Sequence, residues 1–215
     1  MSEAHLSVEP LFSTPMARFQ VPDFDQEVLD VDEVDLENDP EWFQNPKQDK
    51  VWNHSSHHIL LEPEYNDLKT MVESAIESYL YMVLSVQKDI TIKHASSWLT
   101  IGLDGCATAE HLHTNSVYSG ILYLRSLPNS GNLFFVKGDA PSWCSTTILP
   151  RISSFNILNS ASYEVQPNEG DVFVFPSHCR HGVTVNNSGT RRCALAFNYT
   201  LEGLISDTHT NYLKL

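Results

Sequence analysis

Two histidines stand two residues apart in the sequence, and a third lies far downstream. His111 and His113 flank Leu112 in a segment whose residue types favour a β-strand. Side chains alternate between the two faces of a strand, so both imidazoles would project to the same side and could bind one metal ion. His181 is the best third ligand, because it follows an apolar run that ends at Pro176. These residues predict a metal site made of histidines alone.

The ligand set limits the chemistry of such a site. Three protein ligands leave three positions open on an octahedral ion, which suits a non-haem Fe(II) oxygenase that must also bind a cosubstrate and O₂. The same residues would suit zinc in a tetrahedral hydrolytic site. His178 competes with His181 for the distal position. His54, His57 and His58 form a separate cluster, for which we expect a solvated loop or a lid facing the substrate.

A basic residue follows the third histidine. If residues 191–200 form a strand, one face combines a cation with small and polar side chains: Arg192, Ala194, Ala196 and Asn198. A guanidinium beside two alanines leaves room for a small anion, and it can hold a carboxylate through two parallel hydrogen bonds. An arginine at the rim of a barrel is the alternative. Arg191 would point outward into solvent.

The elements that would position these residues are mostly strands. Apolar residues three and four apart predict an amphipathic helix over 64–86, with Pro63 at its start. A weak helix near 26–36 and a strand within 10–19 are further expectations. Turn residues separate nine predicted strands, at about 91–102, 107–113, 117–127, 131–137, 152–158, 161–166, 171–176, 181–187 and 191–200. The pattern predicts an α+β domain that is mostly β, an antiparallel sandwich or barrel with a supporting helix.

The charge distribution suggests three segments. Residues 1–40 hold eleven Asp or Glu and one Arg or Lys, Arg18, in a chain of net charge −14. We expect 1–60 to be an irregular acidic segment packed on the core, 61–200 to be the domain with its backing helix, and 201–215 to be a tail. The acidic balance argues against nucleic acid as a direct partner.

Other features favour a soluble cytoplasmic protein. No run approaches the roughly 20 apolar residues of a membrane helix, and the first residues lack a basic and then apolar leader. The four cysteines form no CxxC pair, so we expect reduced thiols. An exposed edge strand would allow a homodimer.

Taken in order, several blocks resemble the 2-oxoglutarate/Fe(II)-dependent dioxygenase superfamily, in particular a branch found in phages and marine bacteria. The blocks are 10–15, Trp98 with Gly102, 111–113, 119–124, 131–135, and a last one from 170–177 through His181 and Arg192 to Phe197-Asn198. The spacing within the last block is the most specific part of the resemblance.

The resemblance implies a double-stranded β-helix, also called a jelly roll and shared with the cupins. It implies that His111, His113 and His181 bind Fe(II), and that Arg192 holds the distal carboxylate of the cosubstrate 2-oxoglutarate, with Tyr123 and Ser119 as further contacts. The implied reaction couples decarboxylation of 2-oxoglutarate to C–H oxidation by O₂, typically hydroxylation of a small molecule or of a protein side chain such as proline. The implied location is the cytoplasm of a bacterial or phage-infected cell.

The sequence departs from the superfamily at one ligand. Relatives carry His-x-Asp or His-x-Glu, whereas this chain has His113, a neutral ligand that removes one negative charge from the iron. Glu110 has the wrong strand parity to replace the carboxylate, and Asp104 is a loop carboxylate that could reach the site. Two alternatives therefore stay open: a metal enzyme with a three-histidine, cupin-like site that does not use 2-oxoglutarate, and a non-catalytic, phage-associated β-sandwich binding protein.

Overall fold

The computed structural model describes residues 13–21, 24, 29–137, 150–205 and 213–214, which form two large antiparallel sheets, a small two-stranded sheet and one α-helix. In spatial order the larger sheet contains β1 (Ala17–Gln20), β9 (Asp171–Pro176), β6 (Tyr118–Arg125), β11 (Arg192–Glu202), β4 (Thr91–Gly102), β3 (Val51–His54) and β2 (Trp42–Gln44). The smaller sheet contains β5 (Thr108–His111), β10 (Arg180–Val183), β7 (Leu133–Val136) and β8 (Ser162–Val165). The predicted mostly-β architecture is confirmed.

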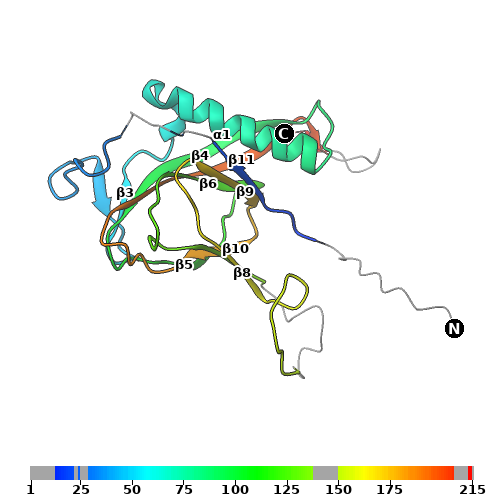
Figure 1. Cartoon of the computed structure of the whole chain (residues 1–215). Helices are drawn as coiled ribbons and strands as arrows, with labels where there is room; N and C mark the ends of the chain where they lie inside the picture. The colour runs from blue at the N-terminus through cyan, green and yellow to red at the C-terminus, as the bar shows by residue number, and fades with distance from the viewer. Residues whose placement is uncertain (1–12, 22–23, 25–28, 138–149, 206–212, 215) are drawn as a thin grey trace.

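The predicted helix covers the outer face of the larger sheet (Figure 1). It is α1 (Asn66–Ser78), preceded by two 3₁₀ turns (Ile59–Leu61 and Pro63–Tyr65) and continued by a π-helical turn (Tyr79–Val83). Its buried apolar residues lie on one face, at spacings of three and four: Leu68, Val72, Ala75, Ile76. They pack against one side of the sheet and form the main hydrophobic core.

Strand alternation divides the larger sheet into two faces with different tasks. On β11, Leu195 and Phe197 belong to the core under the helix, while the alternate residues Ala194 and Ala196 line a cavity between the sheets. This is the division that the sequence predicted for residues 191–200. On β6, Leu122 likewise faces the helix side and Tyr123 the side between the sheets. The site is therefore built on the face that the helix leaves free.

The predicted strand at 152–158 is wrong, because residues 150–161 contain turns and no strand. Side chains there bond to the nearby backbone: Asn156 Oδ1 accepts from the N–H of Leu158, and Asn159 Oδ1 accepts from the N–H of Asn156, both at 2.8 Å. Such local bonds compete with strand pairing. The apolar side chains that suggested a strand, Phe155 and Ile157, are exposed.

The described part of 1–60 contains more strand than the expectation of an irregular segment implies, although β1 overlaps the strand expected within 10–19. Three of its short stretches, β1, β2 and β3, join the larger sheet through backbone hydrogen bonds. Strands of three or four residues are too short to show a period in the sequence. No helix forms over 29–36, where turns are found, and residues 10–12 and 25–28 lie outside the described residues. The tail also contributes strands: β11 extends to Glu202, and β12 (Leu204–Ile205) pairs with β13 (Leu213–Lys214).

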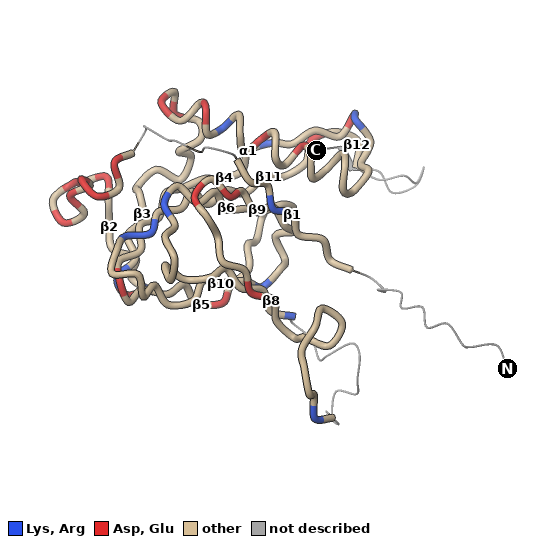
Figure 2. The backbone as a smooth tube through the Cα atoms, viewed as in Figure 1, with Lys and Arg blue, Asp and Glu red and all other residues tan. Residues whose placement is uncertain are grey.

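Asp and Glu residues are concentrated in the segment before β2 and along α1 (Figure 2). The strands that enclose the cavity carry few charges in the same view. Within the part of the chain that the structure describes, no helix is long and apolar enough to cross a membrane.

Candidate metal centre and cosubstrate pocket

The three predicted histidines meet between the sheets. His111 ends β5 and pairs directly with His181 of the neighbouring strand β10. His113 follows β5, where its N–H donates to the carbonyl oxygen of Ser177 at 3.0 Å. One nitrogen of each ring lies within 4.8 Å of one nitrogen of each of the other two. In the described chain this is the only cluster of three or more His, Cys, Asp or Glu side chains that could hold a metal ion.

Hydrogen bonds fix the same tautomer on all three rings. The Nδ1 atoms of His111, His113 and His181 lie 2.8, 2.5 and 2.9 Å from oxygen atoms of Ala109, Asn198 and Cys179 respectively. These are carbonyl oxygens, which only accept, so each Nδ1 carries the proton. Each Nε2 is then unprotonated and has a lone pair available for a metal ion. The donor set fits a divalent metal without rearrangement of protons.

Burial keeps two of these rings neutral. Desolvation is the main cause that lowers the pKa of His181 to about 3. The hydrogen bond to the Cys179 backbone opposes this shift, and the neighbouring His111 and His113 add to it. Desolvation also lowers the pKa of His113. The ring of Phe175 stands 4.7 Å from that of His181, between centroids. Neutral imidazoles in an apolar surrounding are poised to bind a cation.

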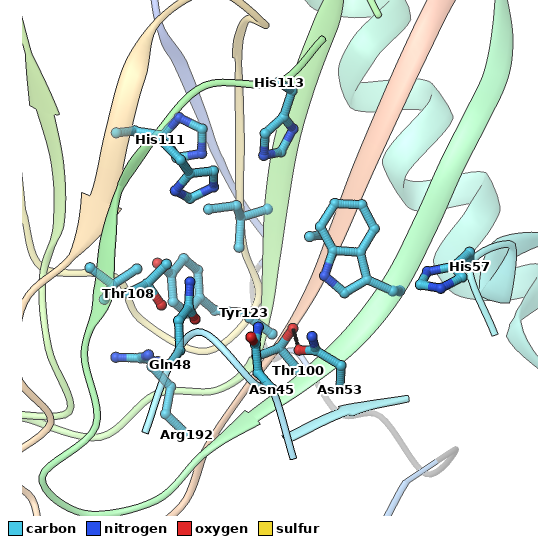
Figure 3. A pocket seen from close by; sticks show the side chains of 16 residues that line it. Asn45, Gln48, Asn53, His57, Thr100, Thr108, His111, His113, Tyr123 and Arg192 are labelled. Atoms are coloured by element: carbon cyan, nitrogen blue, oxygen red, sulfur yellow. Dashed lines mark hydrogen bonds between the residues drawn. The ribbon is translucent and has the colours of Figure 1, made fainter. Parts of the chain in front are cut away.

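A cavity of about 330 Å³ extends from the triad toward Arg192, the first residue of β11. Its lining joins both sheets with the β2–β3 hairpin: Asn45, Gln48, Asn53, His57, Trp98, Thr100, Thr108, the triad, Ile121, Tyr123, Val183, Arg192, Ala194 and Ala196. Figure 3 shows His111 and His113 at one end, with Arg192 at the other and Tyr123 between them. The volume suits a small organic ligand.

Arg192 is a buried cation without a carboxylate partner. Only 4% of its surface is exposed, and none of the salt bridges in the described chain involves it. Its Nη1 donates to the carbonyl oxygen of Ser130 at 2.6 Å, which orients the guanidinium. Gly131, at φ 97°, leaves space for the guanidinium, since a Cβ at this position would lie 2.6 Å from Nη1. The Nη2 of Arg192 donates to Cys106 Sγ, a weak acceptor, at 3.8 Å. A buried positive charge that lines a cavity and has no counter-charge calls for an anionic ligand.

Tyr123 supplies a second free donor in the cavity. Its hydroxyl is fully buried and has no hydrogen-bond partner. Burial raises the pKa of Tyr123 to about 12, against the opposing effect of Arg192, so the phenol keeps its proton. Buried polar groups are almost always paired in native proteins, so this hydroxyl indicates a ligand acceptor. A cation and a phenol together fit a carboxylate.

Ser119 lies elsewhere than the resemblance implies. Its hydroxyl is 2.8 Å from that of Ser177 and 2.7 Å from Asn198 Oδ1, and it does not line the cavity. It supports Asn198, whose Oδ1 also accepts from His113 and whose Nδ2 donates to Ser96 Oγ at 3.0 Å. Sequence reasoning placed Asn198 on the inner face but missed its contact with His113, because this contact joins two distant strands.

The competing residues are placed outside the site. His178 is exposed, Glu110 pairs with Arg180, and Asp104 Oδ1 accepts from the N–H of Gly189 at 2.9 Å. The expectation of a solvated Arg191 is wrong. Its Nη1 donates to the carbonyl oxygens of Val31 and Val34, both at 2.8 Å, because the N-terminal segment folds over this end of β11.

Comparison with known proteins finds one matching family model. Residues 96–198 match the family model described as "Putative 2OG-Fe(II) oxygenase". No curated protein matches the chain.

Two solved structures have a similar fold. HygX from Streptomyces hygroscopicus, with nickel, 2-oxoglutarate and hygromycin B bound, has a TM-score of 0.52 at 13% identity, covering 87% of this chain and 83% of that one. The epimerase SnoN, in complex with Fe³⁺, alpha ketoglutarate and nogalamycin RO, has a TM-score of 0.53 at 12% identity, covering 88% and 81%. These likenesses confirm the predicted double-stranded β-helix.

Proposed function

We propose that residues 96–198, which match the oxygenase family model, form a 2-oxoglutarate/Fe(II)-dependent oxygenase, and that His111, His113 and His181 are its iron ligands. The superfamily uses Fe(II) and 2-oxoglutarate, and the donor atoms of the cavity support both. Three unprotonated Nε2 atoms suit the metal. The guanidinium of Arg192, which has no carboxylate partner, and the free hydroxyl of Tyr123 suit the distal carboxylate.

One observation carries the assignment of residues. A single cavity has three imidazoles converging at one part, and a buried cation without a carboxylate partner beside an unpaired buried phenol at another. A dicarboxylate can bridge the two parts, because Ala194 and Ala196 leave the wall between them open. A hydrolytic zinc enzyme would have no evident use for the Arg192 end.

Each residue has a physical task in this proposal. Arg192 and Tyr123 bind one carboxylate and so orient the cosubstrate. Carbonyl oxygens of Ala109 and Cys179 and the amide of Asn198 hold the three rings in the ligating tautomer. Apolar side chains such as Ile121 and Val183 exclude water from the cavity. When bound, Fe(II) with 2-oxoglutarate and O₂ supplies oxidation of a C–H bond, with succinate and CO₂ as coproducts.

The proposed reaction is hydroxylation of a small molecule or of a protein side chain such as proline. A coupled assay tests this activity. The purified protein, loaded with Fe(II), should convert 2-oxoglutarate to succinate slowly in air even without the primary substrate. Zn(II) should not support this conversion, and the Arg192→Gln variant should lose it. Oxygen uptake that does not depend on 2-oxoglutarate would instead favour the three-histidine, cupin-like enzyme.

A further inference from the structure

One wall of the cavity is used by neither metal nor cosubstrate in the proposed function. Strand register gives its distance from the cosubstrate end: Tyr123 pairs with Ala194, Ala194 with Thr100, and Thr100 with Asn53. Neighbouring strands lie about 4.8 Å apart, so this row spans about 14 Å over its three gaps. A diacid lying along β11 between Arg192 and the triad would leave the β3 side of the cavity open to a second molecule.

The wall on that side is polar and carries no Asp, Glu, Lys or Arg. Its residues come from the β2–β3 hairpin, from the segment after β3 and from β4: Asn45, Gln48, Asn53, His57, Trp98 and Thr100. Among the described residues that line the cavity, Arg192 is the one Asp, Glu, Lys or Arg. A charged substrate group would lose its hydration here and meet no counter-charge, which is unfavourable. The lining therefore selects an uncharged group.

The carboxamides of this wall offer mainly N–H donors. The Oδ1 of Asn45 accepts from the backbone N–H of Lys47 at 2.9 Å, and the Oδ1 of Asn53 accepts from the Thr100 hydroxyl at 3.1 Å. Their NH₂ groups, and both ends of the Gln48 amide, make no hydrogen bond in the described structure. Figure 3 shows these three amides together, across the cavity from His111 and His113. Free N–H groups are complementary to acceptor oxygens on a ligand.

Trp98 connects this wall to the metal centre. Its ring lies 5.9 Å from the ring of His113, between centroids, and it lines the same cavity. A group that packs on the indole face while its oxygens meet the amides would present C–H bonds beside the triad. This is the position that oxidation requires.

We propose that the β2–β3 hairpin is the substrate-selecting wall, and that it takes an uncharged group with several acceptor oxygens, such as a sugar ring or the carbonyls of a peptide. Asn45, Gln48 and Asn53 are its specificity-determining residues. The inference rests on the proposed function of the triad and Arg192, and it narrows the substrate class of that same site.

A series of related ligands that differ in charge tests the proposal. The Zn(II)-loaded protein, which cannot turn over, is titrated calorimetrically with methyl glucoside, glucosamine and glucuronate, with and without 2-oxoglutarate. A second arm uses N-acetylprolinamide, prolinamide and N-acetylproline. In the presence of 2-oxoglutarate, the neutral member of at least one arm should bind about tenfold more tightly than both charged members, or about 1.4 kcal/mol. The arm that responds distinguishes a sugar from a prolyl substrate.

Gln48→Glu provides the gain-of-function test. The side chain is partly exposed in the hairpin, so the variant should fold, and the new carboxylate should shift preference about tenfold toward glucosamine or prolinamide. Gln44→Glu is the matched control, because Gln44 lies in the same hairpin, is exposed and does not line the cavity. It should leave the order of affinities unchanged.

The outcomes separate the two proposals. Equal binding of neutral and cationic members, no binding of either neutral member at millimolar concentration, or no shift in Gln48→Glu would overturn the substrate inference. The comparison of neutral with cationic members is made with and without 2-oxoglutarate, so it stands even if the cosubstrate does not bind. Failure of 2-oxoglutarate to bind the same Zn(II) protein would count against the proposed function alone.

Discussion

The Nδ1–H of His113 donates a hydrogen bond to Oδ1 of Asn198, and the two atoms lie 2.5 Å apart. His113 follows β5 of the smaller sheet, whereas Asn198 lies on β11 of the larger one. The bond therefore joins the two sheets at the metal centre. An amide is also a neutral partner, so it fixes the His113 tautomer without adding charge beside the metal.

Asn198→Ala should weaken binding of Co(II) or Zn(II) to the protein about 10- to 100-fold, because the third imidazole loses the acceptor that orients it. Competition with a coloured chelator measures this affinity. Ser126→Ala is the control: it removes a buried polar group away from the triad, a hydroxyl bonded to the Pro167 carbonyl oxygen at 3.0 Å. Equal metal affinity in the wild type and Asn198→Ala would contradict the positioning role.

Tyr123→Phe should affect stability and binding differently. The buried hydroxyl has no partner in the free protein, so its removal should leave the free energy of unfolding unchanged or slightly higher. Binding of 2-oxoglutarate to the metal-loaded protein should weaken about 10- to 100-fold, since a bond to a charged acceptor is worth roughly 1.5–3 kcal/mol. Tyr118→Phe, on the same strand but outside the cavity, should bind 2-oxoglutarate normally. Normal binding by Tyr123→Phe would remove the phenol from the proposed clamp.

Substitutions of the two adjacent arginines should affect stability and 2-oxoglutarate binding differently. Arg191→Ala should lower the free energy of unfolding by about 1–3 kcal/mol, because two backbone carbonyl oxygens lose their donor, and should leave 2-oxoglutarate affinity intact. Arg192→Gln should weaken 2-oxoglutarate binding strongly, because the distal carboxylate loses its cationic partner. Urea denaturation and cosubstrate titration of both variants provide the comparison. The reverse pattern would mean that the cavity arginine is structural.

His94 should contribute to acid sensitivity of the metal-free protein. Burial, with smaller effects from His58 and Lys69, lowers the pKa of His94 from 6.5 to about 4. Between these values the unfolded chain binds a proton that the folded chain does not, so stability is full above pH 6.5 and falls as pH falls toward 4. His94→Gln should reduce this slope in urea denaturation, while His178→Gln, at an exposed position, should not. Equal slopes in the wild type and His94→Gln would refute the assignment.

The sequence predicted the parts of the fold and site that depend on local pattern. Strand parity placed His111 and His113 on one side and aligned Arg192 with Ala194 and Ala196, and the structure has the same arrangement. The helix was predicted because the apolar residues recur at spacings of three and four over a run too long to be coincidental.

Features that depend on distant contacts could not be predicted. Asn198 meets His113 only when the two sheets close, and nothing local marks that contact. Asn45 and Gln48 lie in the turn of the β2–β3 hairpin, and Asn53 lies on a strand too short to show alternation. The false strand at 152–158 had apolar residues of the right type, but Asn156 and Asn159 bond to their own backbone there.

Anaerobic titration of the metal-free protein with Fe(II) and then 2-oxoglutarate, followed by visible absorbance, tests the central assignment most directly. Chelation of Fe(II) by the cosubstrate should give a charge-transfer band when both are present, retained in His178→Ala, lost in His181→Ala and weakened in Arg192→Gln. One bound iron per chain and no band in the wild type would contradict the proposal that this site binds iron and 2-oxoglutarate together.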